Sequence, residues 1–300
     1  MAAAAAIAGP RASLRRRGRR ALPLAFIAPA LLLVALVNFF PALYGFATSL
    51  FETSYAKRVA FVGLNQYARL VADERALAAI GNALVYVVAS VALALGIGLG
   101  LALMLARPWP LAGLFRTVLL APWVISQTVT ALLWGWMLNP LYGPASFALG
   151  QLGLPSFDLL GTPATALPTV IAVNVWHAFP LPMILSLAAL QTIPVELIEA
   201  ARMDGATRLQ VFRHVTLPAL KRTLMMAAVS LTIYCFAQVT LIYTLTGGGP
   251  LGRTETISVL AFKYALVDWQ LGYAAALGTI IFGLNVIFGV AYLRVLRGPQ

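Results

Sequence analysis

Six long stretches of this chain contain no Asp, Glu, Lys or Arg, and they restrict the possible folds more than any other feature. The stretches are Ala21–Phe51, Ala76–Ala106, Thr117–Phe157, Leu159–Val195, Thr223–Gly252 and Trp269–Leu293. A helix crosses a bilayer core with about 20 apolar residues, so each stretch holds one crossing. The sequence therefore predicts an all-α integral membrane protein with six transmembrane helices, at about 22–50, 80–106, 114–138, 167–190, 224–245 and 272–293.

The distribution of positive charge predicts how these helices are oriented. The net charge is +12, which could indicate nucleic-acid binding, but the basic residues cluster in the connections between the predicted helices. If the helices cross alternately, fifteen of the 21 lysines and arginines fall on the side of the N-terminus. Because basic residues are enriched in cytoplasmic loops, we expect both termini to be cytoplasmic and no nucleic-acid partner.

The N-terminal residues differ in composition from the rest of the chain. Residues 1–20 are rich in Ala and Arg, and we expect a disordered basic tail that is attracted to anionic membrane lipid. Residues 21–300 then form one six-helix membrane domain. Within it, "GIGLGLAL" at 96–103 has two readings: its small residues allow close approach of a second helix, or its glycines face lipid.

Motifs for covalent chemistry are absent from the sequence. It contains no GxxxxGK[ST], HExxH, CxxC or GxSxG, and Cys235 is its single cysteine. His177 is the only residue in a predicted helix that titrates near neutrality, which argues against proton-coupled transport. We therefore expect no enzymatic activity, no metal and no cofactor in this chain. Energy for transport would come from a partner, unless the chain is a self-sufficient channel or facilitator for a small polar solute.

One charged segment interrupts the apolar stretches, with the sequence "EAARMDGATRLQVFRHVTLPAL" at 199–220. Residues 195–203 read as a short helix that ends at Asp204-Gly205, because glycine readily adopts left-handed conformations. Thr207 and Gln210 have the spacing of a capping box that opens a second short helix. Leu217-Pro218 then leads back into the membrane. The sequence predicts a cytoplasmic helix–turn–helix elbow within a loop at 193–222, which could simply pack against neighbouring loops.

The spacing in this elbow resembles a known signature. Glu199-Ala200-Ala201 is followed after three residues by Gly205, and nine residues later by Val215-x-Leu217-Pro218. This resembles the coupling loop of bacterial binding-protein-dependent ABC importers, EAA-x3-G-x9-I-x-LP, and departs from it only at Val215. The segments "NVWHAFPLPMILSLAALQTIPVELIEAARMDGA", "LIYTLTGGGP" and "GYAAALGTIIF" are similar to permeases of the carbohydrate-uptake group. Among these, the chain most resembles the maltose-type subunit with a glycine-rich loop after helix five.

The resemblance implies a type I ABC importer permease fold in the bacterial inner membrane and a set of partners. These are a second homologous permease, two copies of a cytoplasmic ATPase that binds ATP and Mg, and an extracytoplasmic sugar-binding protein. The elbow would enter a groove of the ATPase, and this role falls on Glu199, Ala200, Ala201, Asp204, Gly205, Leu217 and Pro218.

A sugar site is expected midway through the membrane, since amide groups and aromatic rings together suit sugar hydroxyls and ring faces. Asn174 and His177 lie three apart and Tyr234 and Gln238 four apart, so each pair shares a helix face. The resemblance aligns these positions with sugar contacts of the maltose-type permease, but His177, Ala178, Leu181 and Gln238 differ in type. The sugar therefore stays open between maltodextrin, trehalose, another oligosaccharide and a glycerol phosphate compound. Alternatively, Asn174 and Gln238 only hydrogen-bond to neighbouring helices.

Overall fold

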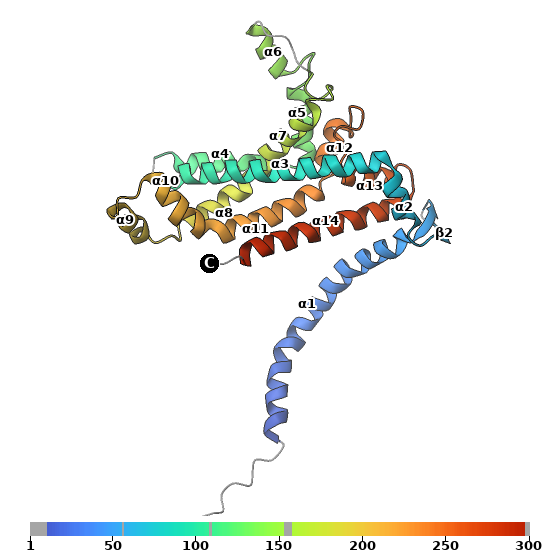
Figure 1. Ribbon diagram of the computed structural model, residues 1–300, viewed down its shortest axis with the longest axis horizontal. Coiled ribbons are helices and arrows are strands. Elements are labelled where there is room, and N and C mark those ends of the chain that lie inside the picture. Colours follow the sequence, from blue (N-terminus) through green and yellow to red (C-terminus); the bar gives the residue numbers. More distant parts are fainter. Residues whose placement is uncertain (1–10, 56, 108–109, 153–157, 298–300) are drawn as a thin grey trace, which may run out of the picture.

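The molecule is built around a bundle of long helices, and the computed structural model describes residues 11–55, 57–107, 110–152 and 158–297. The long helices are α1 (Arg11–Ser49), α3 (Glu74–Leu105), α11 (Leu217–Phe236) and α14 (Leu271–Arg297). Figure 1 shows α3, α8 (Pro180–Leu190), α11 and α14 running along the bundle. One end carries α9 (Val195–Met203) and α10 (Arg208–Val211), and the other carries α2 (Asn65–Ala72) and β2 (Lys57–Phe61). By length and composition four helices can each cross a membrane alone, and two bent pairs bring the number to six. The predicted all-α membrane fold is confirmed.

The predicted third helix is broken, so the expectation of one helix over 114–138 was wrong. It consists of α4 (Ala112–Val124) and α5 (Gln127–Met137), whose axes differ by 98°. Pro122 lacks a backbone N–H near the end of α4, and Ile125 is extended. The Ser126 side chain then accepts a hydrogen bond from the Val129 N–H, so that it caps α5. A proline followed by a good N-cap explains why the chain turns here.

The predicted fourth and fifth helices are also divided. Helix four consists of α7 (Ala166–Ala178) and α8 (Pro180–Leu190), with a bend of 42° beside two prolines. Helix five was expected at 224–245, but α11 begins earlier and ends at Phe236, and the short α12 (Thr240–Thr246) follows. Prolines and local turns override hydrophobicity in placing these ends, since hydrophobicity measures only the length of an apolar stretch.

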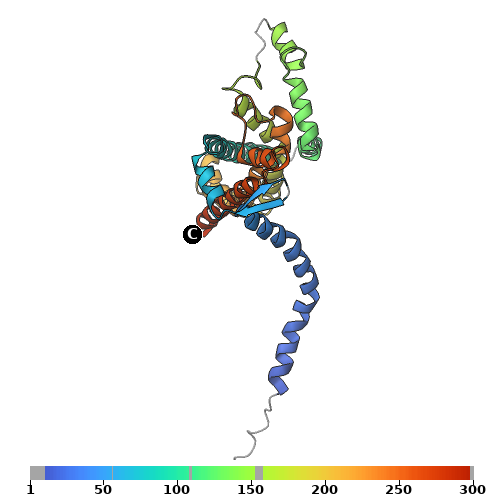
Figure 2. The ribbon, with the colours of Figure 1, turned by 90° about the vertical axis from the view of Figure 1, so that its right-hand side faces the viewer.

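The first helix leaves the bundle. The expected disordered tail covered 1–20; residues 1–10 lie outside the described residues, and 11–20 form the start of α1. Alanine, leucine and arginine are strong helix formers, so the helix continues beyond the apolar stretch. Figures 1 and 2 agree that α1 extends away from the bundle on the side opposite to α5. Only its last turns pack against α14, and its apolar part from Ile27 is exposed.

The end of the bundle away from α9 carries several short elements. These are the antiparallel hairpin of β1 (Phe51–Ser54) and β2 (Lys57–Phe61), α2 (Asn65–Ala72) and α13 (Ile257–Leu266). A further short helix, α6 (Pro144–Gln151), lies in the connection between α5 and α7.

Glycine allows α3 and α8 to approach closely at one position. A Cβ at Gly98 would lie 2.8 Å from the backbone N of Met183 and 2.9 Å from the backbone O of Phe179. No atom lies within 4 Å of the corresponding position at Gly96 or Gly100. The reading of close helix approach is therefore confirmed for Gly98, whereas Gly96 and Gly100 are exposed.

Candidate functional site

The elbow begins with α9 (Val195–Met203), which ends in a specific turn. Gly205 has a φ of +80°, in the left-handed region. Its N–H donates to the Arg202 carbonyl, and the Ala206 N–H donates to the Ala201 carbonyl. These are the two hydrogen bonds of a Schellman motif, which satisfies the last carbonyls of a helix. The predicted helix and its break at Asp204-Gly205 are confirmed.

The second limb of the elbow begins as predicted but does not end as predicted. The Thr207 N–H donates to the Gln210 side-chain oxygen, and the Gln210 N–H donates to the Thr207 hydroxyl, which confirms the capping box. α10 (Arg208–Val211) then continues through a π-helical turn (Phe212–Thr216) directly into α11. The second limb is therefore the start of a membrane helix rather than a separate short helix.

The predicted coupling residues lie on both limbs of this elbow. Glu199, Ala200 and Asp204 are exposed on α9 and its cap. Leu217 and Pro218 form the first turn of α11, directly after the π-helical turn. Met203 and Leu209 are 88% and 74% exposed at the tip. The elbow thus offers small, apolar and charged groups to a partner at one end of the bundle.

Three of the four predicted sugar-binding residues gather in one cluster, which centres on Tyr234 of α11. The side-chain amides of Gln127 on α5 and Gln238 donate to the Tyr234 hydroxyl, at 2.8 and 3.1 Å. Because this oxygen accepts both bonds, its own proton is directed elsewhere. Gln238 is buried, whereas Tyr234 is half-buried. Three polar side chains, from α5, α11 and the turn after α11, thus meet within the apolar bundle.

His177 on α7 joins the same cluster. Its ring is stacked on that of Tyr234, with centroids 6.4 Å apart and planes at 16°. The buried hydroxyl of Thr130 on α5 lies 3.4 Å from His177 Nδ1. The sequence analysis missed Thr130 and Gln127. Their signal is the polar group "SQTVT" at 126–130 in the middle of an apolar stretch.

Asn174 lies one turn before His177 but is fully buried. Its amide nitrogen lies 3.5 Å from the Cys235 sulfur, and its carbonyl oxygen has no partner among the described residues. Asn174 therefore packs against α11 directly behind the cluster, whereas the other three predicted residues are part of it.

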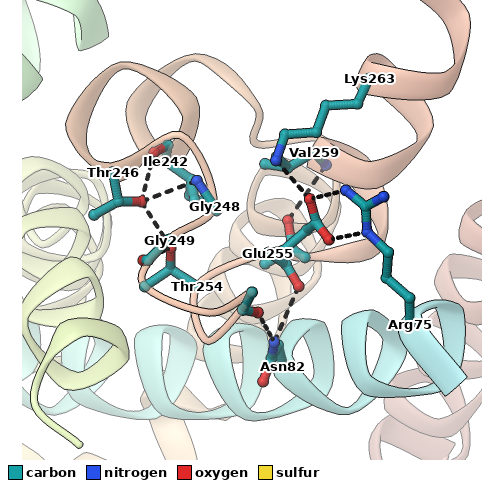
Figure 3. A network of polar contacts seen from close by, with 12 residues as sticks. Arg75, Asn82, Ile242, Thr246, Gly248, Gly249, Thr254, Glu255, Val259 and Lys263 are labelled. Carbon is teal, nitrogen blue, oxygen red and sulfur yellow. Dashed lines mark hydrogen bonds and ion pairs between the residues drawn. The ribbon is translucent and has the colours of Figure 1, made fainter. Parts of the chain in front are cut away.

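A second polar network holds the glycine-rich loop at the other end of the bundle (Figure 3). The Glu255 carboxylate is 3% exposed and accepts hydrogen bonds from Arg75 at 2.7 and 2.9 Å and from Lys263 at 2.6 Å. Burial alone would raise the pKa of Glu255, but these two cations outweigh it and hold the pKa below its ordinary value. Asn82 on α3 donates to the Gly252 and Glu255 carbonyls.

The loop also carries hydrogen bonds of its own. The Thr254 hydroxyl donates to the Gly249 carbonyl at 2.7 Å and lies 2.7 Å from the Thr246 hydroxyl. The bonds from α3 and within the loop together fix the segment between α12 and α13. The sequence analysis did not identify this network.

The bundle with broken helices, a charged elbow at one end and a polar cluster inside it define a membrane transport subunit. Residues 92–298 match the family described as "Binding-protein-dependent transport system inner membrane component". The match covers more than half of the chain, so the chain belongs to this family. The predicted family resemblance is confirmed.

Individual proteins give the same assignment. The chain is 35% identical over 273 residues to the trehalose/maltose transport system permease protein MalF of Thermococcus litoralis, covering 90% of this chain and 92% of that protein. It is 30% identical to the sulfoquinovosyl glycerol transport system permease protein SmoG of Agrobacterium fabrum, covering 93% and 92%. A crystal structure of a bacterial alginate ABC transporter in complex with alginate pentasaccharide-bound periplasmic protein has a TM-score of 0.81 at 22% identity, covering 94% and 96%. The predicted ABC importer permease fold is confirmed.

Proposed function

We propose that this chain is a translocation subunit of an ATP-driven ABC importer for a sugar, most simply a di- or oligosaccharide. The elbow carries this proposal. It places Glu199-Ala200-Ala201 and the Gly205 turn at one end of the bundle, in a limb continuous with α11. The names of the relatives above support a sugar as the transported solute.

We infer the partners from the resemblance to the family. A second homologous permease would complete the pore, two ATPase copies would bind ATP and Mg²⁺, and an extracytoplasmic binding protein would deliver the sugar. The chain itself would hold no cofactor and would catalyse no covalent step. Its membrane would be the bacterial inner membrane, with both termini and the elbow on the cytoplasmic side.

The continuous helix suggests how the elbow transmits movement. α10, the π-helical turn and α11 form one helical path from the exposed tip at Leu209 to Tyr234 in the polar cluster. A groove that moves the elbow when the ATPase binds ATP would therefore also move Tyr234 and Gln238. In this way one rigid element would couple the ATPase to the inner polar cluster.

The inner polar cluster is the proposed sugar site. The Tyr234 proton and the two amide side chains can exchange their present bonds for bonds to sugar hydroxyls. The stacked rings of His177 and Tyr234 offer an apolar face. Asn174 stays a predicted contact, and in this conformation it supports α11 through Cys235.

Uptake by the purified complex in proteoliposomes tests the proposal, with ATP on the side of the ATPase and a labelled disaccharide on the other. Gln127→Ala and Gln238→Ala should each raise the KM of uptake about 5–12-fold, the effect of losing one hydrogen bond of about 1–1.5 kcal/mol. ATP hydrolysis stimulated by the binding protein should persist. Thr232→Val is the control, because it removes a hydrogen bond between α11 and Tyr292 outside the cluster. A KM unchanged in both glutamine variants would remove them from the sugar site.

The rival function is a self-sufficient channel or facilitator for a small polar solute. It would transport without ATPase subunits and would leave the elbow without a role. Omitting ATP from the same proteoliposomes decides between the two functions. Uptake against a gradient that stops without ATP supports the importer, whereas equal downhill flux with and without the ATPase would overturn it.

A further inference from the structure

A cavity of about 470 Å³ lies where the elbow meets the ends of α3 and α8. Three arginines from separate segments line it. Arg107 follows the end of α3, Arg202 lies in the last turn of α9, and Arg208 begins α10. Six of the ten lining residues are apolar, among them Leu103 and Leu190.

These arginines have no acidic partner within the described part of the chain. The ion pairs found there join Glu255 to Arg75 and Lys263, at the other end of the bundle. No carboxylate lines the cavity, and the elbow acid Asp204 lines a neighbouring hollow instead. Three like charges facing one space repel one another, so the cavity is suited to an anion.

The position of the cavity indicates the kind of anion. Leu103 lies in the last turn of the apolar span Glu74–Leu105, and Leu190 ends α8. The arginines therefore lie at the depth where a bilayer changes from acyl chains to headgroups. Guanidinium groups bind phosphate oxygens in pairs, and basic pockets beside membrane helices bind anionic headgroups. An acidic peptide would match the charges but not the apolar wall.

We propose that this cavity binds the phosphate headgroup of an anionic membrane lipid, with the apolar wall against its glycerol and upper acyl chains. The headgroup links Arg107 on the bundle to Arg202 and Arg208 on the two limbs of the elbow. It thereby restrains the elbow relative to α3. Its effect on ATPase coupling rests on the proposed function, whereas the binding itself does not.

Lipid retention by the purified complex tests the proposal. Complexes are incorporated into nanodiscs that contain equal phosphatidylglycerol and phosphatidylcholine, and the lipids retained after extraction are counted by native mass spectrometry. Each arginine near an anionic lipid contributes about a fivefold preference, so R107Q/R202Q/R208Q should reduce the preference for phosphatidylglycerol by ~100-fold. The control R213Q/R222Q/R294Q removes the same charge from exposed positions outside the cavity and should retain the preference.

A single variant and a soluble anion complete the test. Arg107→Gln lies outside the elbow and should lower the preference about fivefold with the ATPase still bound. Equal retention by the cavity variants and the control would overturn the proposal. If inorganic phosphate displaces the retained lipid at millimolar concentration, the site belongs to a soluble phosphate, and the assignment to lipid is wrong. Lipid retention is measured without sugar and without ATP, so its failure is distinguishable from failure of the proposed function.

Discussion

Replacing Gly98 with alanine should separate α3 from the junction of α7 and α8. The added Cβ would meet Met183 N at 2.8 Å, Phe179 O at 2.9 Å and Pro182 Cγ at 2.9 Å. Two of these atoms are backbone and the third belongs to a proline ring, so none can rotate away. The helices must therefore move apart.

The cost can be worked out against a matched glycine. Overpacking a close contact costs about 1–3 kcal/mol. Glycine to alanine in a helix also gains up to about 1 kcal/mol from helix propensity, and this gain is shared by Gly100→Ala, where no atom lies within 4 Å. The difference between the two variants isolates the packing term. Gly98→Ala should be the less stable by about 1–3 kcal/mol.

Thermal unfolding of the purified complex in detergent measures this difference, with sugar uptake as a second readout. We expect a lower midpoint for Gly98→Ala than for Gly100→Ala. Uptake should also fall, because His177 lies directly before the junction that moves. A Gly98→Ala midpoint equal to or above that of Gly100→Ala would refute the reasoning, since the neighbouring backbone would then be free to yield.

Three other changes have defined outcomes. Gly205→Leu introduces ~1–3 kcal/mol of backbone strain and should release the ATPase during copurification. Gly205→Asn should retain the ATPase, because asparagine tolerates the φ of +80°. Equal retention of the ATPase by both variants would contradict this. Thr207→Ala removes the capping side chain and should lower stability by about 1 kcal/mol, with an unchanged unfolding midpoint as the contrary result. The pKa of Glu255 is lowered in the folded protein. Its contribution to the free energy of unfolding is therefore complete above its ordinary pKa of 4.5, and it is lost as the pH falls through the lowered value. The Glu255→Gln variant should therefore be less stable than the unchanged protein at pH 7, but it should lose less stability on acidification. Parallel plots of stability against pH for the two proteins would show that the network adds no stability.

The elbow could be predicted in detail because its signals are local. A helix end, a left-handed glycine and a capping box are each defined by residues within one or two turns. The spacing from Glu199 to Pro218 therefore determined most of its structure. The π-helical turn at Phe212–Thr216 was missed, since no pattern in those five residues distinguishes it from an α-helix.

The parts that were not predicted depend on contacts between distant segments. Arg75 and Glu255 are 180 residues apart, and neither residue alone indicates the other. Gly98 differs from Gly96 and Gly100 only because α8 approaches it. The 98° bend after Val124 needed the combination of Pro122 and Ser126, which an apolar stretch conceals. Hydrophobicity thus predicted where the chain crosses but not how each crossing is divided.

Photo-crosslinking from the two ends of the bundle tests the central claim most directly. A photoreactive residue is introduced at Met203 on the elbow or at Leu251 in the glycine-rich loop, which are 88% and 89% exposed. In the assembled complex in membranes, Met203 should crosslink to the ATPase and Leu251 should not. Two results would contradict the assignment of the elbow as the coupling element. One is a crosslink between Leu251 and the ATPase, and the other is no crosslink between Met203 and the ATPase in a complex whose uptake still depends on ATP.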